Sequence, residues 1–289
     1  MPTIDEKRVY DEVTPPTPVF VAAEQGLVVA RLSDDTVGEF SLARRCLATD
    51  VAVGPDGTLA LATDESVLVA PDADPDRLQQ TEFGPATAVS VVEGPERAVV
   101  AVEPAGEIAR LPIPDGGFDP ASPATAADWA GLGSVADARA VDGGLVAAAD
   151  GVHRITASGL DDAGLDDARD VAARGAPLAA TTDGLYELGN GWMLAREGAH
   201  ETVATDGERA HAVAAAGAVF ARDSGGGEWT PLDLPTEAVI VDVDYTDGGA
   251  VAATQSGSLL ATGGDRWRSR AIGVTGVRSI ATGPPRDGA

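Results

Sequence analysis

The sequence predicts an all-β fold: a seven-bladed β-propeller whose blades are four-stranded antiparallel sheets. Short apolar runs alternate with turn residues along the chain, and glycine recurs where the middle hairpin of each unit should turn. The steps between these turns are 40, 40, 45, 33, 33 and 40 residues. A repeat near 40 residues with four short strands per unit is typical of a propeller. The turn positions are Gly26, Ser66 (in place of glycine), Gly106, Gly151, Gly184, Gly217 and Gly257.

The stretch VAVGPDGTLALATDESVLVAP, residues 51–71, shows the repeat most clearly. Two apolar runs, residues 58–63 and 66–70, are separated only by Asp64 and Glu65, which suits a tight hairpin. Pro55, Asp56 and Gly57 break the chain before them and end a first strand at residues 50–53. We therefore expect three strands of one antiparallel sheet here, with a fourth at residues 78–83.

The other elements are assigned in the same way, after an N-terminal extension of residues 1–18 with a candidate strand at Lys7–Tyr10. Residues 19–289 are predicted to form one propeller domain, and the insertion at residues 114–134 is its least regular part. The remaining expected strands are 19–23, 27–32 and 37–42; 87–92, 97–103 and 107–113; 136–141, 145–150 and 151–156; 168–173, 177–182, 184–188 and 192–197; 201–206, 210–215, 218–222 and 228–232; 239–245, 250–255, 258–262 and 266–272.

Ring closure follows from the two chain ends. The first unit lacks an inner strand before Val19, whereas VRSIAT at residues 277–282 reads as an inner strand with nothing after it. Pairing the two in one blade would close the ring and remove its open edges. This gives seven blades; six or eight stay open as alternatives, because Lys7–Tyr10 is unplaced and the shortest steps are only 33 residues.

Composition limits the function classes. The chain has 46 acids and 20 bases, a formal net charge of −26, and Lys7 is its only lysine. Such a surface argues against nucleic acid as a partner, which needs clustered Lys and Arg. It resembles the surfaces of salt-adapted archaeal cytoplasmic proteins, whose self-repulsion salt would screen. The lone Cys46 fits a reducing compartment, and the acidic N-terminus and the absence of an 18-residue apolar run indicate neither a signal peptide nor a membrane span. We expect a cytoplasmic protein, monomeric, without a membrane association.

The residues 50–57, DVAVGPDG, match the Asp-Val-Ala-Val-x-Pro-Asp-Gly pattern of bacterial and archaeal propellers, and 242–249, DVDYTDGG, is a looser copy. DSGGGEW at residues 223–229 resembles a degenerate Asp-box turn, one residue too long and without the leading Ser or Thr. Taken over nearly its full length, the chain resembles an uncharacterised haloarchaeal β-propeller family. The resemblance implies the propeller fold and carries no known activity.

Two sets of polar residues are the candidate sites. Aligning the inner strands on their following turns places one polar residue near the start of each, and these seven should form a ring in the central channel. We expect Arg139 to pair with Asp170 on the next blade. The second set lies on the middle-hairpin turns, which should project from one face and favour a basic partner. The channel set is Asp50, Ser90, Arg139, Asp170, Thr202, Asp242 and Ser279; the hairpin set is Glu24, Gln25, Asp64, Glu65, Glu103, Asp150, Asp183 and Gln255.

Signals of catalysis are weak. His153, His200 and His211 have no partners at metal-ligand spacing, and there is no GxSxG elbow. The sequence therefore favours a non-enzymatic scaffold that docks another protein and uses no cofactor. The alternatives are a small-ligand binder or hydrolase that acts at the channel on a sugar or with a divalent cation, and a paralogue that has lost an ancestral activity.

Overall fold

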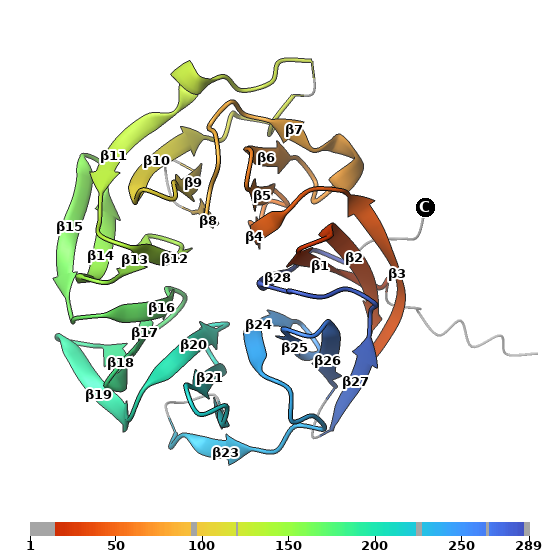
Figure 1. Cartoon of the computed structure of the whole chain (residues 1–289), viewed down its shortest axis with the longest axis vertical. Helices are drawn as coiled ribbons and strands as arrows, with labels where there is room; N and C mark the ends of the chain where they lie inside the picture. The colour runs from red at the N-terminus through yellow and green to blue at the C-terminus, as the bar shows by residue number, and fades with distance from the viewer. Residues whose placement is uncertain (1–14, 94–96, 120, 224–226, 264–265, 286–289) are drawn as a thin grey trace, which may run out of the picture.

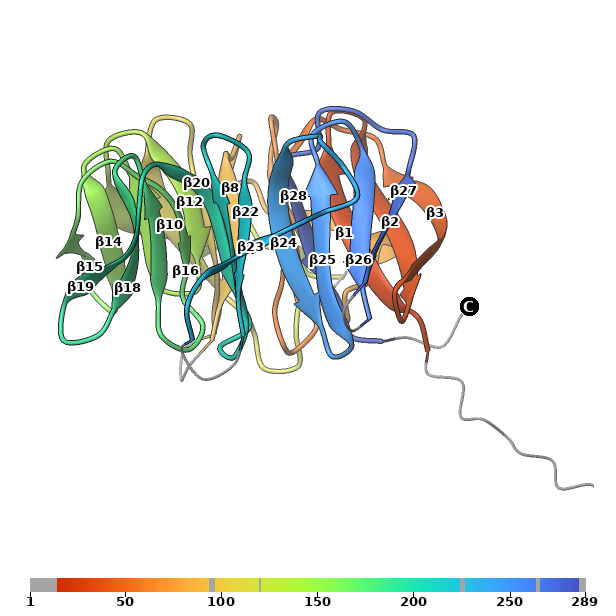
Figure 2. The ribbon, with the colours of Figure 1, turned by 90° about the horizontal axis from the view of Figure 1, so that it is seen from below.

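The protein is a seven-bladed propeller (Figure 1). The computed structural model describes residues 15–93, 97–119, 121–223, 227–263 and 266–285; the candidate strand Lys7–Tyr10 and part of the Asp-box-like turn at residues 223–229 lie outside them. Within this part of the chain, seven four-stranded sheets surround a central channel, and each sheet is antiparallel throughout. Seen from the side, the blades form a short, wide disc (Figure 2).

The strands are grouped here by their place in the blade, from the channel outward. The innermost strands are β28 (Ser279–Thr282), β4 (Ala48–Val53), β8 (Ala88–Val92), β12 (Ala138–Asp142), β16 (Ala168–Ala172), β20 (His200–Thr205) and β24 (Ile240–Thr246). The second strands are β1 (Thr17–Ala23), β5 (Leu59–Thr63), β9 (Ala98–Val102), β13 (Leu145–Ala148), β17 (Leu178–Thr181), β21 (Ala210–Ala214) and β25 (Gly249–Thr254).

The third strands are β2 (Gly26–Ser33), β6 (Val67–Ala70), β10 (Glu107–Pro112), β14 (Gly151–Thr156), β18 (Gly184–Leu188), β22 (Val219–Arg222) and β26 (Ser258–Thr262). The outermost strands are β3 (Thr36–Arg44), β7 (Gln79–Gln80), β11 (Ala130–Ser134), β15 (Gly159–Gly164), β19 (Trp192–Glu197), β23 (Thr230–Leu232) and β27 (Trp267–Ala271). Two single-turn 3₁₀ helices, η1 (Pro75–Arg77) and η2 (Ala126–Asp128), lie before β7 and β11. No helix in the described ranges is long and apolar enough to cross a bilayer.

The ring is closed by the two chain ends, as the sequence predicted. The C-terminal β28 pairs antiparallel with β1, with Val21 opposite Ile280 and Val19 opposite Thr282. The strand β1 begins at Thr17, two residues earlier than expected, because Pro18 lies near its start, where a missing N–H is tolerated. The fourth strand of the next blade is shorter than expected, since only Gln79 and Gln80 of residues 78–83 pair with β6.

The hydrophobic core lies between blades and not within one layer. Along β5 the side chains of Leu59 and Leu61 pack toward the preceding blade, and those of Ala60 and Ala62 pack toward the following one. This is the period of two expected for a strand that is buried on both faces. Because aromatic residues make up only 4% of the chain, Val, Ala and Leu fill these interfaces.

The tryptophans that open or precede the outer strands add contacts between blades. Trp192 donates its indole N–H to the carbonyl of Ala163 on the preceding blade at 2.8 Å. Trp267 lies edge-on to His211 of the preceding blade, with ring centroids 5.9 Å apart. In the insertion, residues 130–134 form the outer strand β11, and Trp129 packs against Phe83 of the preceding blade. These contacts confirm the expectation that the tryptophans pack between neighbouring blades.

The two faces of the disc carry different loops. Because neighbouring strands run in opposite directions, the loops between second and third strands lie on the same face as the connections from one blade to the next. We call this the hairpin face. The contact between Gln25, in the β1–β2 turn, and Thr275, in the β27–β28 connection, joins the two kinds of loop.

Candidate functional site: the central channel

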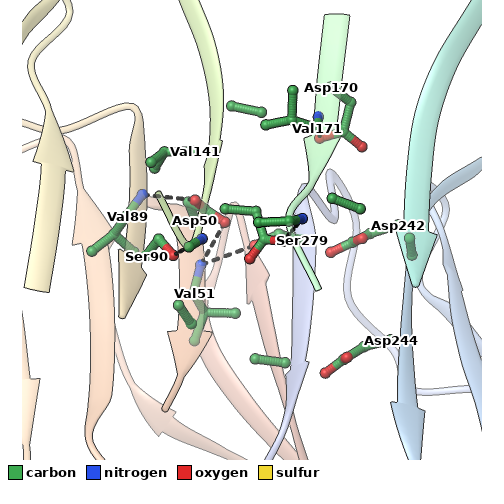
Figure 3. Close-up of a pocket in the computed structure, with 18 of the residues that line it drawn as sticks. Asp50, Val51, Val89, Ser90, Val141, Asp170, Val171, Asp242, Asp244 and Ser279 are labelled. Atoms are coloured by element: carbon green, nitrogen blue, oxygen red, sulfur yellow. Dashed lines mark hydrogen bonds between the residues drawn. The ribbon is translucent and has the colours of Figure 1, made fainter. Parts of the chain in front are cut away.

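The seven innermost strands enclose a cavity of about 660 Å³. All seven channel residues named from the sequence line it. Figure 3 shows Asp50, Asp170 and Asp242 from three different strands directed toward this space, with Asp244 further along β24. The structure therefore places the predicted set together, although its members do not occupy equivalent positions.

Strand register separates these residues into two levels. Pairing with the second strands makes one set of residues equivalent, which we call the upper tier, and the residues two positions later form the lower tier. The upper tier is Asp50, Ala88, Ala140, Asp170, Thr202, Asp242 and Ser279. The lower tier, two residues along each strand, is Ala52, Ser90, Asp142, Ala172, Ala204, Asp244 and Ala281.

Two residues of the predicted ring are therefore displaced. Ser90 lies in the lower tier, and Arg139 lies one residue before Ala140, at an irregularity where the β12–β13 register shifts. A shift of one residue moves a side chain to the other side of a strand, so an alignment made on turns alone cannot resolve it.

The upper-tier carboxylates join neighbouring blades through backbone hydrogen bonds. One oxygen of Asp50 accepts the N–H of Val51, and the other accepts the N–H of Val89 on β8, both at 2.8 Å. Asp170 repeats this arrangement with Val171 and with Val203 on β20, also at 2.8 Å. In both cases, the distant donor is the residue that follows the equivalent upper-tier position on the next strand. Each carboxylate thus holds two inner strands at a fixed separation.

The same rule holds where the upper-tier residue is alanine and a lower-tier residue takes over. On β8, the hydroxyl of Ser90 accepts the N–H of Gly143 at 3.0 Å. On β12, Asp142 accepts the N–H of Ala173 at 2.6 Å. Blades with a small residue in the upper tier therefore make the link one level lower.

The remaining strands complete the ring. Thr202 donates its hydroxyl to the carbonyl of Val241 at 3.2 Å, and Ser279 accepts the N–H of Val51 at 2.9 Å. The strand β24 makes two such links to the closing strand β28: Asp242 accepts from Ile280 at 2.7 Å and Asp244 from Thr282 at 2.6 Å. Every inner strand is consequently bonded to the next by at least one side chain, and we call the whole set the staple ring.

Burial and mutual repulsion shift the acidity of these groups. Desolvation, followed by the hydrogen bonds that oppose it, raises the pKa of Asp50 to about 6. Desolvation together with the negative charges of Asp142 and Asp50 raises the pKa of Asp170 to about 7. The pKa of Asp242 is raised well above its ordinary value by desolvation and by neighbouring carboxylates, including Asp244. The channel therefore holds several carboxylates that ionise reluctantly.

Arg139 does not neutralise Asp170, contrary to the sequence-based expectation. Its guanidinium pairs with Asp137 at 3.0 Å and with Asp167 on the following blade, and it also donates to the carbonyl of Ala168. The nearby Arg169 donates to both oxygens of Glu201. These pairs lie at the channel end next to the hairpin face, because both arginines stand at the start of their inner strands.

The described residues contain no group of three or more His, Cys, Asp or Glu side chains arranged to hold a metal ion. The two carboxylate oxygens of Asp50, of Asp170 and of Asp242 each already accept a backbone N–H. The arrangement that the structure shows is thus one that fixes the backbone of the ring.

The hairpin residues named from the sequence all stand at the middle-hairpin turns. Asp150 contacts His153 at 3.0 Å, and Asp183 accepts the hydroxyl of Thr181 at 2.6 Å. Exposed side chains in this set are Glu24, Gln25, Asp64, Glu65, Asp150, Asp183 and Gln255, while Glu103 is half-buried.

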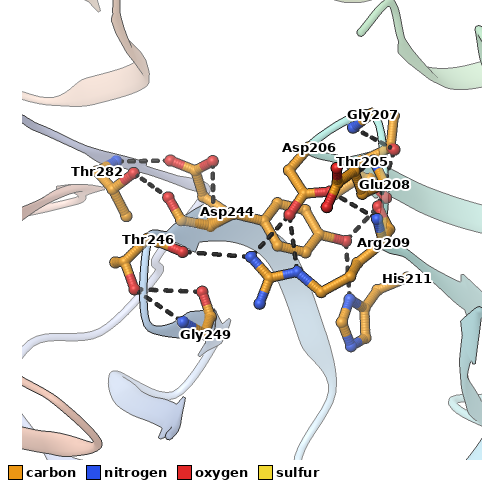
Figure 4. A network of polar contacts seen from close by, with 12 residues as sticks. Thr205, Asp206, Gly207, Glu208, Arg209, His211, Asp244, Thr246, Gly249 and Thr282 are labelled. Atoms are coloured by element: carbon orange, nitrogen blue, oxygen red, sulfur yellow. Dashed lines mark hydrogen bonds and ion pairs between the residues drawn. The ribbon is translucent and has the colours of Figure 1, made fainter. Parts of the chain in front are cut away.

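A second polar network, missed by the sequence, links the last two blades near the opposite face (Figure 4). The phenol of Tyr245 lies 2.8 Å from Nδ1 of His211 and donates to the carbonyl of Ala204. Burial lowers the pKa of His211 to about 4. Arg209 is held by Asp206 and reaches the carbonyl of Thr246 at 3.3 Å. This network is structural, since each side chain binds a neighbour within the fold.

The staple residues Asp142 and Asp244 were also missed. Their signal was present in the sequence, because they stand two residues after positions 140 and 242 and alternate residues of a strand face the same side. Applying the period of two to each inner strand, and not only one position per strand, identifies them.

A family described as "Beta-prop_HVO_0234:-like, beta propeller" matches residues 3–283 of this chain. Among solved structures, the WD40 β-propeller domain of Doa1 is similar with a TM-score of 0.62, at 12% identity over 94% of both chains. A chain of a nidogen/laminin complex has a TM-score of 0.60, at 9% identity over 94% of this chain and 100% of that one. YCF48 bound to a D1 peptide has a TM-score of 0.56, at 16% identity over 79% and 82%. A search of curated proteins gave no match.

Proposed function

The chain belongs to this β-propeller family, and from that premise we propose that it is a non-enzymatic scaffold that docks a protein partner on its hairpin face. The observation that carries the proposal is the staple ring. Because the channel carboxylates are bonded to the backbone of neighbouring blades, the ring is a rigid frame, and its exposed loops are held in fixed positions.

The charge of the hairpin tips defines the partner. Glu24, Asp64 and Glu65 are exposed, and their side chains make no hydrogen bond or ion pair within the described part of the chain. A surface with such a field attracts basic segments and speeds their association. Two of the similar structures, by their titles, contain a bound peptide or a complex with another protein, which is compatible with docking on a propeller. The partner is accordingly a protein with a basic segment, in a salt-adapted cytoplasm.

The test compares two triple charge reversals. The hairpin-tip variant carries Glu24→Lys, Asp64→Lys and Glu65→Lys. The control carries Asp76→Lys, Glu208→Lys and Asp247→Lys, three exposed acids on the opposite face, so the net charge changes equally. Affinity capture from a lysate of the source organism, in molar KCl, is followed by mass spectrometry.

We expect one protein to be retained by the wild type and by the control, and to be lost from the hairpin-tip variant. Loss from the control alone would contradict the assignment of the face. Capture of no specific protein, together with saturable binding of Ca²⁺ or of a sugar in calorimetry, would favour the channel as a ligand site and overturn the scaffold proposal.

A further inference from the structure

A groove of about 310 Å³ lies at the edge of the hairpin face, over the blade formed by β8 to β11. We call it the rim groove. Its lining consists of Phe83, Glu103, Glu107, Ile108, Ala109, Gly131, Gly133 and Ser134. Ligand pockets range from about 300 to 1,000 Å³, so a groove of this size suits one long side chain of a partner and not a folded element.

The walls of the rim groove are apolar and fixed. The ring of Phe83 is held by Trp129, with centroids 4.4 Å apart, and the indole N–H of Trp129 donates to the carbonyl of Thr81 at 3.2 Å. The opposite side is the outer strand β11, where Gly131 contributes no side chain and a Cβ built there would meet no atom within 4 Å. An aromatic ring therefore faces open space beside a bare strand.

Two carboxylates stand at the mouth of this groove, and none of its lining residues is basic. Glu103 and Glu107 flank the β9–β10 turn, and the N–H of Glu103 donates to the carbonyl of Glu107 at 2.8 Å. Their positions are thus tied across one hairpin. Like charges paired across strands are unfavourable, and a cation placed between them removes the repulsion.

We propose that the rim groove receives an arginine side chain from an extended segment of the protein partner. This rests on the proposed function and specifies its recognition chemistry. A guanidinium stacks on an aromatic face and bonds carboxylates in its own plane, while its aliphatic stem lies on apolar surface. Ile108 and Ala109 supply that surface, and Phe83 supplies the ring. A divalent cation fits less well, since it needs six or more oxygen ligands and the walls are mainly carbon.

The test uses the peptide acetyl-Gly-Arg-Gly-amide and its citrulline counterpart, which has the same shape without the charge. Backbone amide NMR signals of the intact protein are followed in 0.5 M KCl, where long-range attraction to the acidic surface is largely screened. We expect saturable shifts at Gly131, Gly133 and Ser134 with the arginine peptide, and none with the citrulline peptide.

Matched variants separate the groove from general charge. We expect Glu103→Gln/Glu107→Gln to weaken binding of the arginine peptide at least tenfold and Phe83→Leu at least threefold. Asp64→Asn/Glu65→Gln removes two charges from another hairpin of the same face and should leave the affinity within twofold. Equal weakening by both double variants, or shifts scattered over the surface, would overturn the proposal.

The two proposals fail separately. If Glu103→Gln/Glu107→Gln retains the captured partner while the hairpin-tip variant loses it, the groove assignment is wrong and the scaffold proposal stands. If the peptide binds as expected but no variant changes protein capture, the groove stands and the hairpin-tip docking is wrong.

Discussion

The carboxylate of Asp242 accepts the backbone N–H of Ile280 at 2.7 Å, and so the last complete blade holds the strand that closes the ring. Its other oxygen accepts the N–H of Val243 at 2.7 Å. The ladder between β28 and β1 pairs the two ends of the chain, and this carboxylate bonds the same strand from its other side. Closure of the propeller therefore depends on a side chain as well as on backbone pairing.

Removing this link should destabilise the protein. Asp242→Ala leaves two backbone N–H groups without their acceptor, and a buried unpaired donor costs about 1–3 kcal/mol. Loss of the repulsion among channel carboxylates offsets part of this. We expect the unfolding temperature to fall by roughly 4–8 °C in calorimetry, at about 2–4 °C per kcal/mol for a chain of this class. The exposed control Asp247→Ala should change it by less than about 2 °C; equal effects of the two variants would contradict a stapling role.

Stability should decline as pH rises from 6 to 8. Asp50 and Asp170 have folded-state pKa values of about 6 and about 7 against an ordinary 3.8, so the folded state binds more protons than the unfolded state between these values. The stability that these groups contribute is complete below pH 3.8 and is lost as pH rises through 6 to 7. His211, with its pKa lowered from 6.5 to about 4, acts in the opposite sense, but only below pH 6.5.

The measurement is a series of thermal melts at constant 2 M KCl. We expect a loss on the order of 1–3 kcal/mol between pH 6 and 8. Asp170→Asn cannot ionise and should flatten the profile, even though it lowers overall stability by losing one acceptor. A profile of the same slope in this variant would show that Asp170 does not carry the effect.

Two glycines with the same backbone conformation should respond differently to alanine. Gly217 and Gly257 both turn middle hairpins with φ near +88°. A Cβ at Gly217 would meet nothing within 4 Å, whereas one at Gly257 would lie 1.9 Å from the carbonyl oxygen of Val274. Gly217→Ala should cost about 1–2 kcal/mol from the left-handed conformation alone. Gly257→Ala must displace the backbone as well, so we expect its loss, measured by chemical denaturation, to be at least twice as large.

Salt should stabilise the fold. With a formal charge of −26 and several carboxylates around one channel, the folded chain repels itself, and the Debye length falls from about 30 Å at 0.01 M to about 3 Å at 1 M salt. We expect the unfolding temperature to rise between 10 mM and 1 M KCl at pH 7.5. A sixfold charge reduction through the control triple charge reversal described above should shrink that rise; melts that do not change with KCl would contradict the salt-adapted interpretation.

Much of this architecture was predictable because turn chemistry and the period of the strands are local properties. The hairpin Asp64–Glu65, the tryptophan at 192 and the orphan strand at residues 277–282 each identify a place in the repeat without reference to anything distant. The candidate channel set was also close to correct, since residues near the start of the inner strands do line one cavity. Register was the weak point, as Arg139 and Ser90 demonstrate.

By itself, the sequence determined that seven small sheets repeat, that the chain ends share a blade and that polar residues stand at the inner strands, because composition and periodicity act within about 40 residues. Only the tertiary structure decided that Asp50 bonds Val89 and that Asp142 and Asp244 complete the ring, because such links join residues that are equivalent only after the blades pack. A one-residue bulge that local pattern hardly records reverses which side of a strand a side chain faces, and in this protein that orientation separates Arg139, paired at the channel mouth, from the carboxylates that hold the blades together.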